Sequence, residues 1–134
     1  DFSGEFPHTY EEISSLKGIG PYTAGAIASI AFGLPEPAVD GNVMRVLSRL
    51  FEVNLDIGVP ANRKVFQAMM EILIDPQRPG DFNQALMDLG SDIEAPVNPR
   101  PEDRNLVLLT YMEQWIDTLS KLLRKNLFQF ICMV

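Results

Sequence analysis

The sequence predicts an all-α fold, and three observations support that prediction. Apolar residues recur at intervals of three and four, which is the spacing of one helix face. No stretch shows the strict alternation of a half-buried strand, and glycine and proline punctuate the apolar stretches as they do at helix ends. With 134 residues, 46% of them hydrophobic, the chain is long enough for one domain with its own core.

The first elements are expected to be a short helix, a glycine hairpin and a second helix. Thr9 and Glu12 have the spacing of a capping box at the start of a helix over residues 10–16. A second helix is expected to start at Pro21, whose missing N–H costs nothing at the first helical position, and to end at Gly33.

The hairpin itself is expected to bind an anion. Gly18 and Gly20 bracket its tip, where φ > 0 is accessible and no Cβ blocks a ligand. Free N–H groups and the positive end of the helix dipole would face outward together. A phosphate of a nucleic-acid backbone fits such a site.

Three further elements precede a change in character of the sequence. Asp40 is expected to cap a third helix, a fourth is stopped by Pro76 and a Pro79-Gly80 turn, and Asp81 is expected to cap a fifth. A proline-rich loop over residues 94–105 is followed by an amphipathic tail over 106–134. The apolar residues of this tail predict a long helix: Leu108, Met112, Trp115, Ile116, Leu119, Leu122 and Leu123. We treat residues 1–134 as one domain, with the hairpin unit at 7–34 and the helices after it at 35–93.

Composition limits the chemistry. Cys132 is the only cysteine, which excludes an internal disulfide framework and a thiolate metal or cluster site, so no cofactor is expected. His8 is expected at the surface or at a helix cap rather than as a ligand. No apolar run approaches the roughly 20 residues of a membrane span, and the acidic start lacks a basic signal region. A cytoplasmic location is therefore expected.

The net charge of −7 counts against nucleic-acid binding, because nonspecific affinity for DNA comes mainly from Lys and Arg. The objection weakens if the few cations cluster. Lys17 lies in the hairpin, and Arg45 and Arg49 follow Asp40 at helical spacing, so the three side chains are expected to form one local positive face.

Two segments together resemble a known family. Residues 16–24 (LKGIGPYTA) followed by 39–46 (VDGNVMRV) are similar to the helix-hairpin-helix and the catalytic aspartate of the endonuclease III superfamily of DNA glycosylases. The motif residues are most similar to those of A/G-specific adenine glycosylases of the MutY type, and residues 82–90 (FNQALMDLG) match that family's next helix. The resemblance covers about residues 6–93 and implies a helical glycosylase domain, in part.

The resemblance implies a base-flipping repair enzyme that hydrolyses the bond between adenine and deoxyribose, opposite 8-oxoguanine or guanine. Asp40 would stabilise the cationic sugar, and Asn42 would orient Asp40 or the sugar. Tyr22 stands where lyase-competent relatives have a lysine, which implies a monofunctional glycosylase without strong strand cleavage. A bacterial, nucleoid-associated protein is the corresponding expectation.

The DNA contacts implied by the resemblance come from the hairpin, the start of the second helix and one arginine. They are Leu16, Lys17, Gly18, Ile19, Gly20, Tyr22, Thr23 and Arg45. The expected partner is double-stranded DNA with an A:8-oxoguanine or A:G mispair.

The sequence departs from the family pattern in three respects. The general acid of the family is a Glu on a helix upstream of the hairpin, and Glu5, Glu11 and Glu12 do not match its motif. Glu94 stands where most members place the first of four cluster cysteines, so the chain resembles the members without an iron–sulfur cluster. Its proline-rich loop would have to replace the metal by packing alone. The tail after Glu102 matches nothing in the family, and its apolar face is expected to pack on a surface of its own chain or, by self-association, of a second copy.

Two other readings remain open from sequence. A non-enzymatic helix-hairpin-helix DNA-binding module would explain the hairpin and leave the Asp-Gly-Asn motif as coincidence. Another glycosylase of the superfamily, acting on uracil, thymine or oxidised pyrimidines, is disfavoured by Tyr22.

Overall fold

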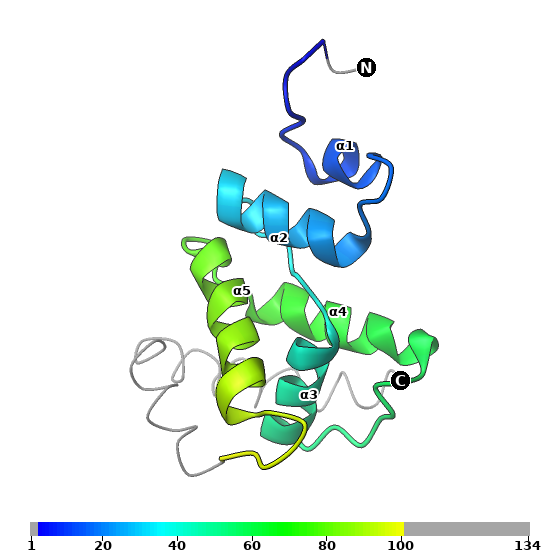
Figure 1. Cartoon of the computed structure of the whole chain (residues 1–134), viewed down its shortest axis with the longest axis vertical. Helices are drawn as coiled ribbons and strands as arrows, with labels where there is room; N and C mark the ends of the chain where they lie inside the picture. The colour runs from blue at the N-terminus through cyan, green and yellow to red at the C-terminus, as the bar shows by residue number, and fades with distance from the viewer. Residues whose placement is uncertain (1–2, 101–134) are drawn as a thin grey trace.

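The computed structural model describes residues 3–100, and every regular element within that range is helical (Figure 1). The predicted all-α class is therefore confirmed. The elements are α1 (Tyr10–Ser14), α2 (Pro21–Phe32), α3 (Gly41–Leu50), the 3-10 turn η1 (Pro60–Asn62), α4 (Arg63–Leu73), α5 (Pro79–Asp88) and the π-helical turn η2 (Leu89–Ile93). The predicted long helix and apolar tail lie outside the described residues.

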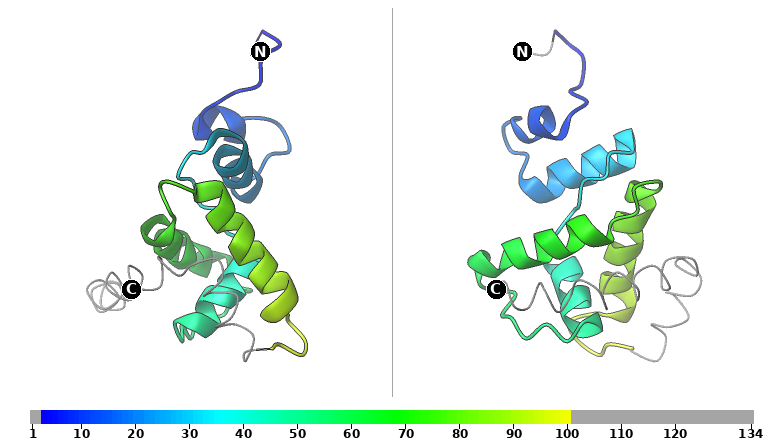
Figure 2. Two further views of the ribbon diagram at one scale, coloured as in Figure 1. Left: turned by 90° about the vertical axis from the view of Figure 1, so that its left-hand side faces the viewer. Right: turned by 180° about the vertical axis from the view of Figure 1, so that it is seen from behind.

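The helices α1 and α2 pack against one another as the hairpin unit (Figure 2). Thr9 Oγ1 accepts a hydrogen bond from the Glu12 amide at 3.3 Å, so the predicted N-cap is present, although α1 ends at Ser14. Pro21 is the first residue of α2, and Gly33 ends this helix in the left-handed conformation with φ 65°, as predicted. Ile13, Ala24 and Ala28 are fully buried between the two helices.

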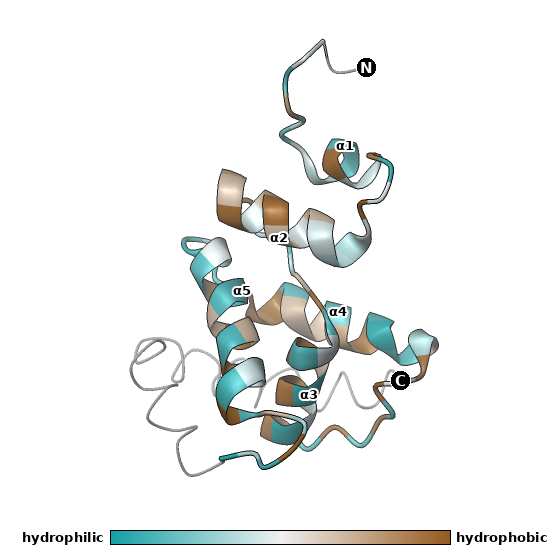
Figure 3. Cartoon of the chain, viewed as in Figure 1, coloured by the Kyte–Doolittle hydropathy of each residue, from teal (hydrophilic) through white to brown (hydrophobic). Residues whose placement is uncertain are grey.

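The helices α3, α4 and α5 enclose the larger core together with η2. Figure 3 shows that each of the three helices carries both hydrophobic and hydrophilic residues, which is the pattern of helices with one buried face. The most buried members of this core are Val43, Val46, Leu47, Phe66, Met70, Leu73 and Leu89.

The helix α5 joins the two groups, because it packs against both α2 and α3. Gly80, near its start, lies so close to α2 that a Cβ would stand 2.8 Å from the Ser29 carbonyl oxygen. A side chain at this position would therefore push the two helices apart.

The predicted start of α5 was wrong. Pro79 and Gly80 do not form a turn before the helix, since α5 begins at Pro79 and Arg78 occupies the N-cap. Asp81 lies in the first turn, where its carboxylate is ion-paired with Arg78 at 2.8 Å. Proline suits the first helical position, and the small Gly80 permits the close approach to α2.

The last described residues follow η2 without another regular helix up to Arg100, in agreement with the prolines there. No helix in residues 3–100 combines the length and apolarity required to cross a membrane.

Glu36 provides a pH test of the fold. Partial burial raises the pKa of its carboxyl group, and the charges of Glu11 and Glu71 raise it further. A carboxyl group whose pKa is raised on folding lowers stability as pH rises from its ordinary value of 4.5 through the raised one. We expect Glu36→Gln to be more stable than the parent chain at pH 7 and equal to it below pH ~4. Urea unfolding at both pH values measures this difference, and an equal difference at both would contradict the assignment to ionisation.

Candidate active site

The hairpin between α1 and α2 presents backbone rather than side chains. Gly18 has φ 89°, a conformation that suits glycine, and the Ile19 amide closes the turn on the Leu16 carbonyl at 3.1 Å. Gly20 has φ −90°, so only the first of the two predicted glycines needs the left-handed region. The space where a Cβ would stand is open at both glycines.

The hairpin exposes one charged side chain and two glycines. Lys17, Gly18 and Gly20 are exposed, whereas the half-buried Ile19 packs its side chain against the core between α1 and α2. Gly20 has no side chain to cap α2, so no side chain accepts from the N–H groups of the first turn, which remain available as donors. The hairpin thus combines backbone donors, the positive end of a 12-residue helix and one lysine.

Asp40 is fixed by two hydrogen bonds at the start of α3. Its Oδ1 accepts from the Val43 amide at 2.8 Å, which makes it the predicted N-cap, and its Oδ2 accepts from Asn42 Nδ2 at 3.2 Å. Both carboxylate oxygens are therefore held, and the side chain remains partly accessible.

Tyr22, in the first turn of α2, lies in the electrostatic field of Asp40. Partial burial raises the pKa of its phenol, and the charge of Asp40 raises it further. The hydroxyl donates to Met87 Sδ on α5 at 3.5 Å. The phenol of Tyr22 at the start of α2 and the carboxylate of Asp40 at the start of α3 thus interact electrostatically.

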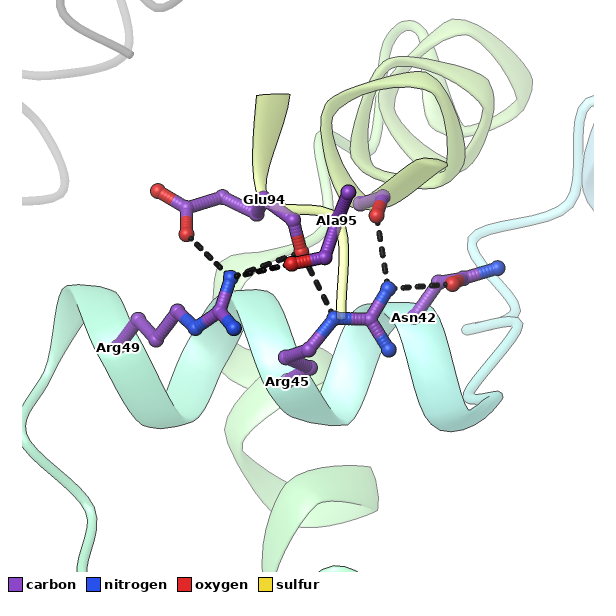
Figure 4. A network of polar contacts seen from close by, with 6 residues as sticks. Asn42, Arg45, Arg49, Glu94 and Ala95 are labelled. Atoms are coloured by element: carbon purple, nitrogen blue, oxygen red, sulfur yellow. Dashed lines mark hydrogen bonds and ion pairs between the residues drawn. The ribbon is translucent and has the colours of Figure 1, made fainter. Parts of the chain in front are cut away.

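Arg45, which is expected to share a positive face with Lys17, has internal hydrogen-bond acceptors. Its Nε donates to the Glu94 carbonyl oxygen, and its Nη2 donates to the Gly90 carbonyl oxygen and to Asn42 Oδ1, each at 2.7 Å (Figure 4). Burial lowers the pKa of this guanidinium, and neighbouring Arg49 lowers it further. The arginine therefore links the end of η2 to Asn42, and through it to Asp40.

Arg49 and Glu94 form a buried ion pair at the position that the family resemblance assigns to a cluster cysteine. Arg49 Nη1 lies 2.9 Å from Glu94 Oε2 and also donates to the carbonyl oxygens of Glu94 and Ala95 (Figure 4). The Glu94 side chain is 0% exposed and that of Arg49 is 29% exposed. The expectation that packing alone holds this loop was wrong, because charge-assisted hydrogen bonds hold it as well.

The described residues do not fit an iron–sulfur cluster. Within residues 3–100 no three His, Cys, Asp or Glu side chains gather as they would around a metal ion, and that stretch contains no cysteine. The carboxylate at the position of the first cysteine is committed to Arg49.

Two residues near Asp40 were not identified from the sequence. Asn83 on α5 is fully buried and binds the segment before Asp40, and Arg63 at the start of α4 donates to the Val39 carbonyl oxygen at 2.8 Å. The available signal for Asn83 was an amide beside Phe82, on the buried face of an amphipathic helix. No sequence signal distinguished Arg63 from a solvated surface charge.

Comparison with known proteins supports the same relationship. A family model for the helix-hairpin-helix motif matches residues 1–30. The chain is 49% identical over 88 residues to an adenine DNA glycosylase of Arabidopsis thaliana, covering 66% of the chain and 14% of the relative. It is 45% identical over 100 residues to the human adenine DNA glycosylase, covering 74% and 18% respectively. For that of Buchnera aphidicola subsp. Baizongia pistaciae, the identity is 40% over 103 residues, covering 74% and 28%.

The chain is therefore similar to a segment of adenine DNA glycosylases, and the predicted resemblance is confirmed. It spans less than a third of the length of these relatives, which come from a plant, an animal and a bacterium.

The buried ion pair yields a prediction of stability. Arg49→Met removes the cationic partner of a fully buried carboxylate, and we expect a loss of about 3 kcal/mol in the free energy of unfolding. Arg78→Met is the matched control, because Arg78 is ion-paired with Asp81 at side-chain exposures of 71% and 61%. Its loss should stay below about 1 kcal/mol. Equal losses of unfolding free energy in urea for the two variants would show that the buried pair contributes no more to stability than the exposed one.

Proposed function

We propose that this chain is the hairpin-bearing and aspartate-bearing segment of an adenine DNA glycosylase that acts in base excision repair. Its substrate would be adenine mispaired with 8-oxoguanine or guanine in double-stranded DNA, with the adenine extruded from the helix for cleavage. One observation carries the proposal: a carboxylate held through both oxygens interacts electrostatically with Tyr22, in the first turn of a helix that follows a glycine hairpin and has no side-chain N-cap.

The hairpin would hold the DNA backbone. Its donors are backbone N–H groups with open space at Gly18 and Gly20, so a phosphate can approach closely. Lys17 is exposed beside them and adds positive charge. Arg45, in contrast, has internal acceptors for its Nε and Nη2, so we assign it to holding Asn42 rather than to phosphate.

Asp40 would act on the sugar. Loss of adenine leaves positive charge on the deoxyribose, and a carboxylate already oriented by Val43 and Asn42 would stabilise that charge without reorganising. The reaction also needs a proton donor for the leaving base. We assign that task to no residue of this chain, in keeping with the upstream Glu that the resemblance implies.

Tyr22 would occupy the position next to this chemistry without providing an amine. Its phenol stays protonated at neutral pH because its raised pKa lies above the ordinary 10.0. With no lysine at this position, no Schiff base to the opened sugar would form there. Cleavage of the strand itself is therefore not proposed.

The first test of the proposal concerns the hairpin. Gly20→Val places a side chain in open space at φ −90°, so the fold is expected to tolerate it while phosphate is kept away. Losing one or two hydrogen bonds to a phosphate should weaken duplex binding by about tenfold. Ala61→Val in the exposed turn η1 is the control, and it should bind as the parent does. Fluorescence anisotropy at two salt concentrations measures this, and equal Kd values for both variants would remove the hairpin from the interface.

The second test concerns chemistry. The 134-residue chain alone should release no appreciable adenine. A longer protein that includes the upstream segment, meaning the helix with the general-acid Glu of the family, should act on an 8-oxoguanine:adenine duplex. In that longer protein, Asp40→Asn removes the charge and keeps an N-cap, so single-turnover adenine release should fall by at least about a hundredfold with little change in Kd.

The matched control is Asp56→Asn, because the Oδ1 of Asp56 also accepts a backbone N–H, that of Gly58 at 2.8 Å, in an exposed turn. It should retain the parent rate. A fully active Asp40→Asn enzyme would leave Asp40 as a helix cap only, and binding without cleavage by the longer protein would favour a non-enzymatic DNA-binding module.

A further inference from the structure

The segment that leads into Asp40 has little regular hydrogen bonding of its own. It runs from the end of α2 to the start of α3 and contains Pro35 and Pro37, which lack backbone donors (Figure 1). Ala38 is 0% exposed and Val39 is 3% exposed, so their peptide groups are shielded from water. Peptide groups buried in this way require partners from elsewhere in the fold.

Asn83 on α5 holds two of these peptide groups. Its Oδ1 accepts from the Ala38 amide at 3.2 Å, and its Nδ2 donates to the Glu36 carbonyl oxygen at 3.0 Å and to Ser29 Oγ at 2.8 Å. The amide orientation follows from the backbone, because the Ala38 N–H requires an acceptor and the Glu36 carbonyl requires a donor. Asn83 thereby ties the segment to α2 and α5 at once.

Arg63 holds the peptide group that joins Val39 to Asp40. Its Nη1 donates to the Val39 carbonyl oxygen at 2.8 Å from the start of α4. The α2 side of the segment is confined as well, because a Cβ on Gly25 would overlap the Pro37 carbonyl oxygen. The backbone before Asp40 is thus held by hydrogen bonds from α4 and α5 and by close packing against α2.

We propose that Arg63 and Asn83 are positioning residues for Asp40, acting through the three peptide groups at Glu36–Pro37, Pro37–Ala38 and Val39–Asp40. The proposal rests on the function proposed above for Asp40. The hydrogen bonds from the Val43 amide and from Asn42 Nδ2 fix the carboxylate of Asp40 relative to α3. Arg63 and Asn83 fix the backbone that leads into α3 relative to α2 and the hairpin. The distance between a phosphate bound at the hairpin and the carboxylate of Asp40 would depend on the constraint from Arg63 and Asn83.

Arg63 is the better residue to test, because it is exposed and its replacement leaves no buried cavity. In the longer protein that includes the upstream segment, Arg63→Met removes the donor to Val39 and retains an unbranched chain. We expect single-turnover adenine release to fall by about tenfold or more while duplex Kd changes less than about twofold, since small displacements of a catalytic group slow the chemical step. Arg63→Lys retains a donor and should recover part of the rate.

Arg78→Met serves as the control for loss of an exposed arginine, and it should keep the parent rate. A merely structural role for Arg63 would lower the free energy of unfolding without this split between rate and Kd. A parent-like rate in Arg63→Met would overturn the proposal.

A second readout does not depend on activity. In the 134-residue chain, Arg63→Met should shift the NMR resonance of the Asp40 amide, which shares its peptide group with the Val39 carbonyl, and Asn83→Ala should speed hydrogen exchange at Ala38. Unchanged resonances and exchange would overturn the proposal even if the parent enzyme proves inactive. An inactive parent with both changes present would instead overturn the proposed function and leave the positioning intact.

Discussion

The structure around Asp40 depends on the way Arg45 and Arg49 close the end of η2. Helix ends leave carbonyl groups without intrahelical donors, and those of Gly90 and Glu94 belong to buried residues here. Two guanidinium groups, spaced one helical turn apart on α3, supply these donors. Their positive charge also interacts favourably with the negative end of the helix dipole. The same groups tie α3 to residues more than forty positions later in the chain. Gly90 completes the fit, because a Cβ there would stand 2.8 Å from Asn42 Cβ.

The internal hydrogen bonds of Arg45 and Arg49 leave this acidic chain with fewer cations available at its surface. Guanidinium groups that serve carbonyls and a buried carboxylate contribute little to a phosphate-binding surface. Under the proposed function, an acidic chain of this kind would bind DNA through uncharged backbone donors and the helix dipole, and such contacts depend on geometry more than on net charge. The exposed glycines at the hairpin tip, Gly18 and Gly20, meet that requirement.

Much of the fold was predictable because local signals carried it. Thr9, Pro21, Gly33 and Asp40 each act at a helix end through their own backbone neighbourhood, and each lies where the sequence placed it. The start at Pro79 was misjudged because proline and glycine also signal turns, and the contact with Ser29 that explains Gly80 is not visible in sequence.

In the candidate site, hydrogen bonds between residues close in sequence were predictable, whereas those between distant residues were not. Asp40 and Asn42 are neighbours in sequence, so their hydrogen bond follows from spacing alone. The acceptors of Arg45 lie on η2, however, and a guanidinium with solvent-facing spacing gives no sign that carbonyl groups will reach it. From the sequence, Glu94 stands only at the position of a cluster cysteine, because its buried pairing with Arg49 depends on the tertiary fold.

The position of α5 late in the chain has a consequence for biosynthesis. A chain emerging from the ribosome can form α1, the hairpin and α2 early, because their contacts are local. The peptide groups before Asp40 find their side-chain partners only after Asn83 has emerged, and the arginines of α3 wait for Glu94 and Ala95. The hairpin unit can thus form early in translation, while the segment before Asp40 gains the hydrogen bonds of Asn83 only after about as much chain again has been made.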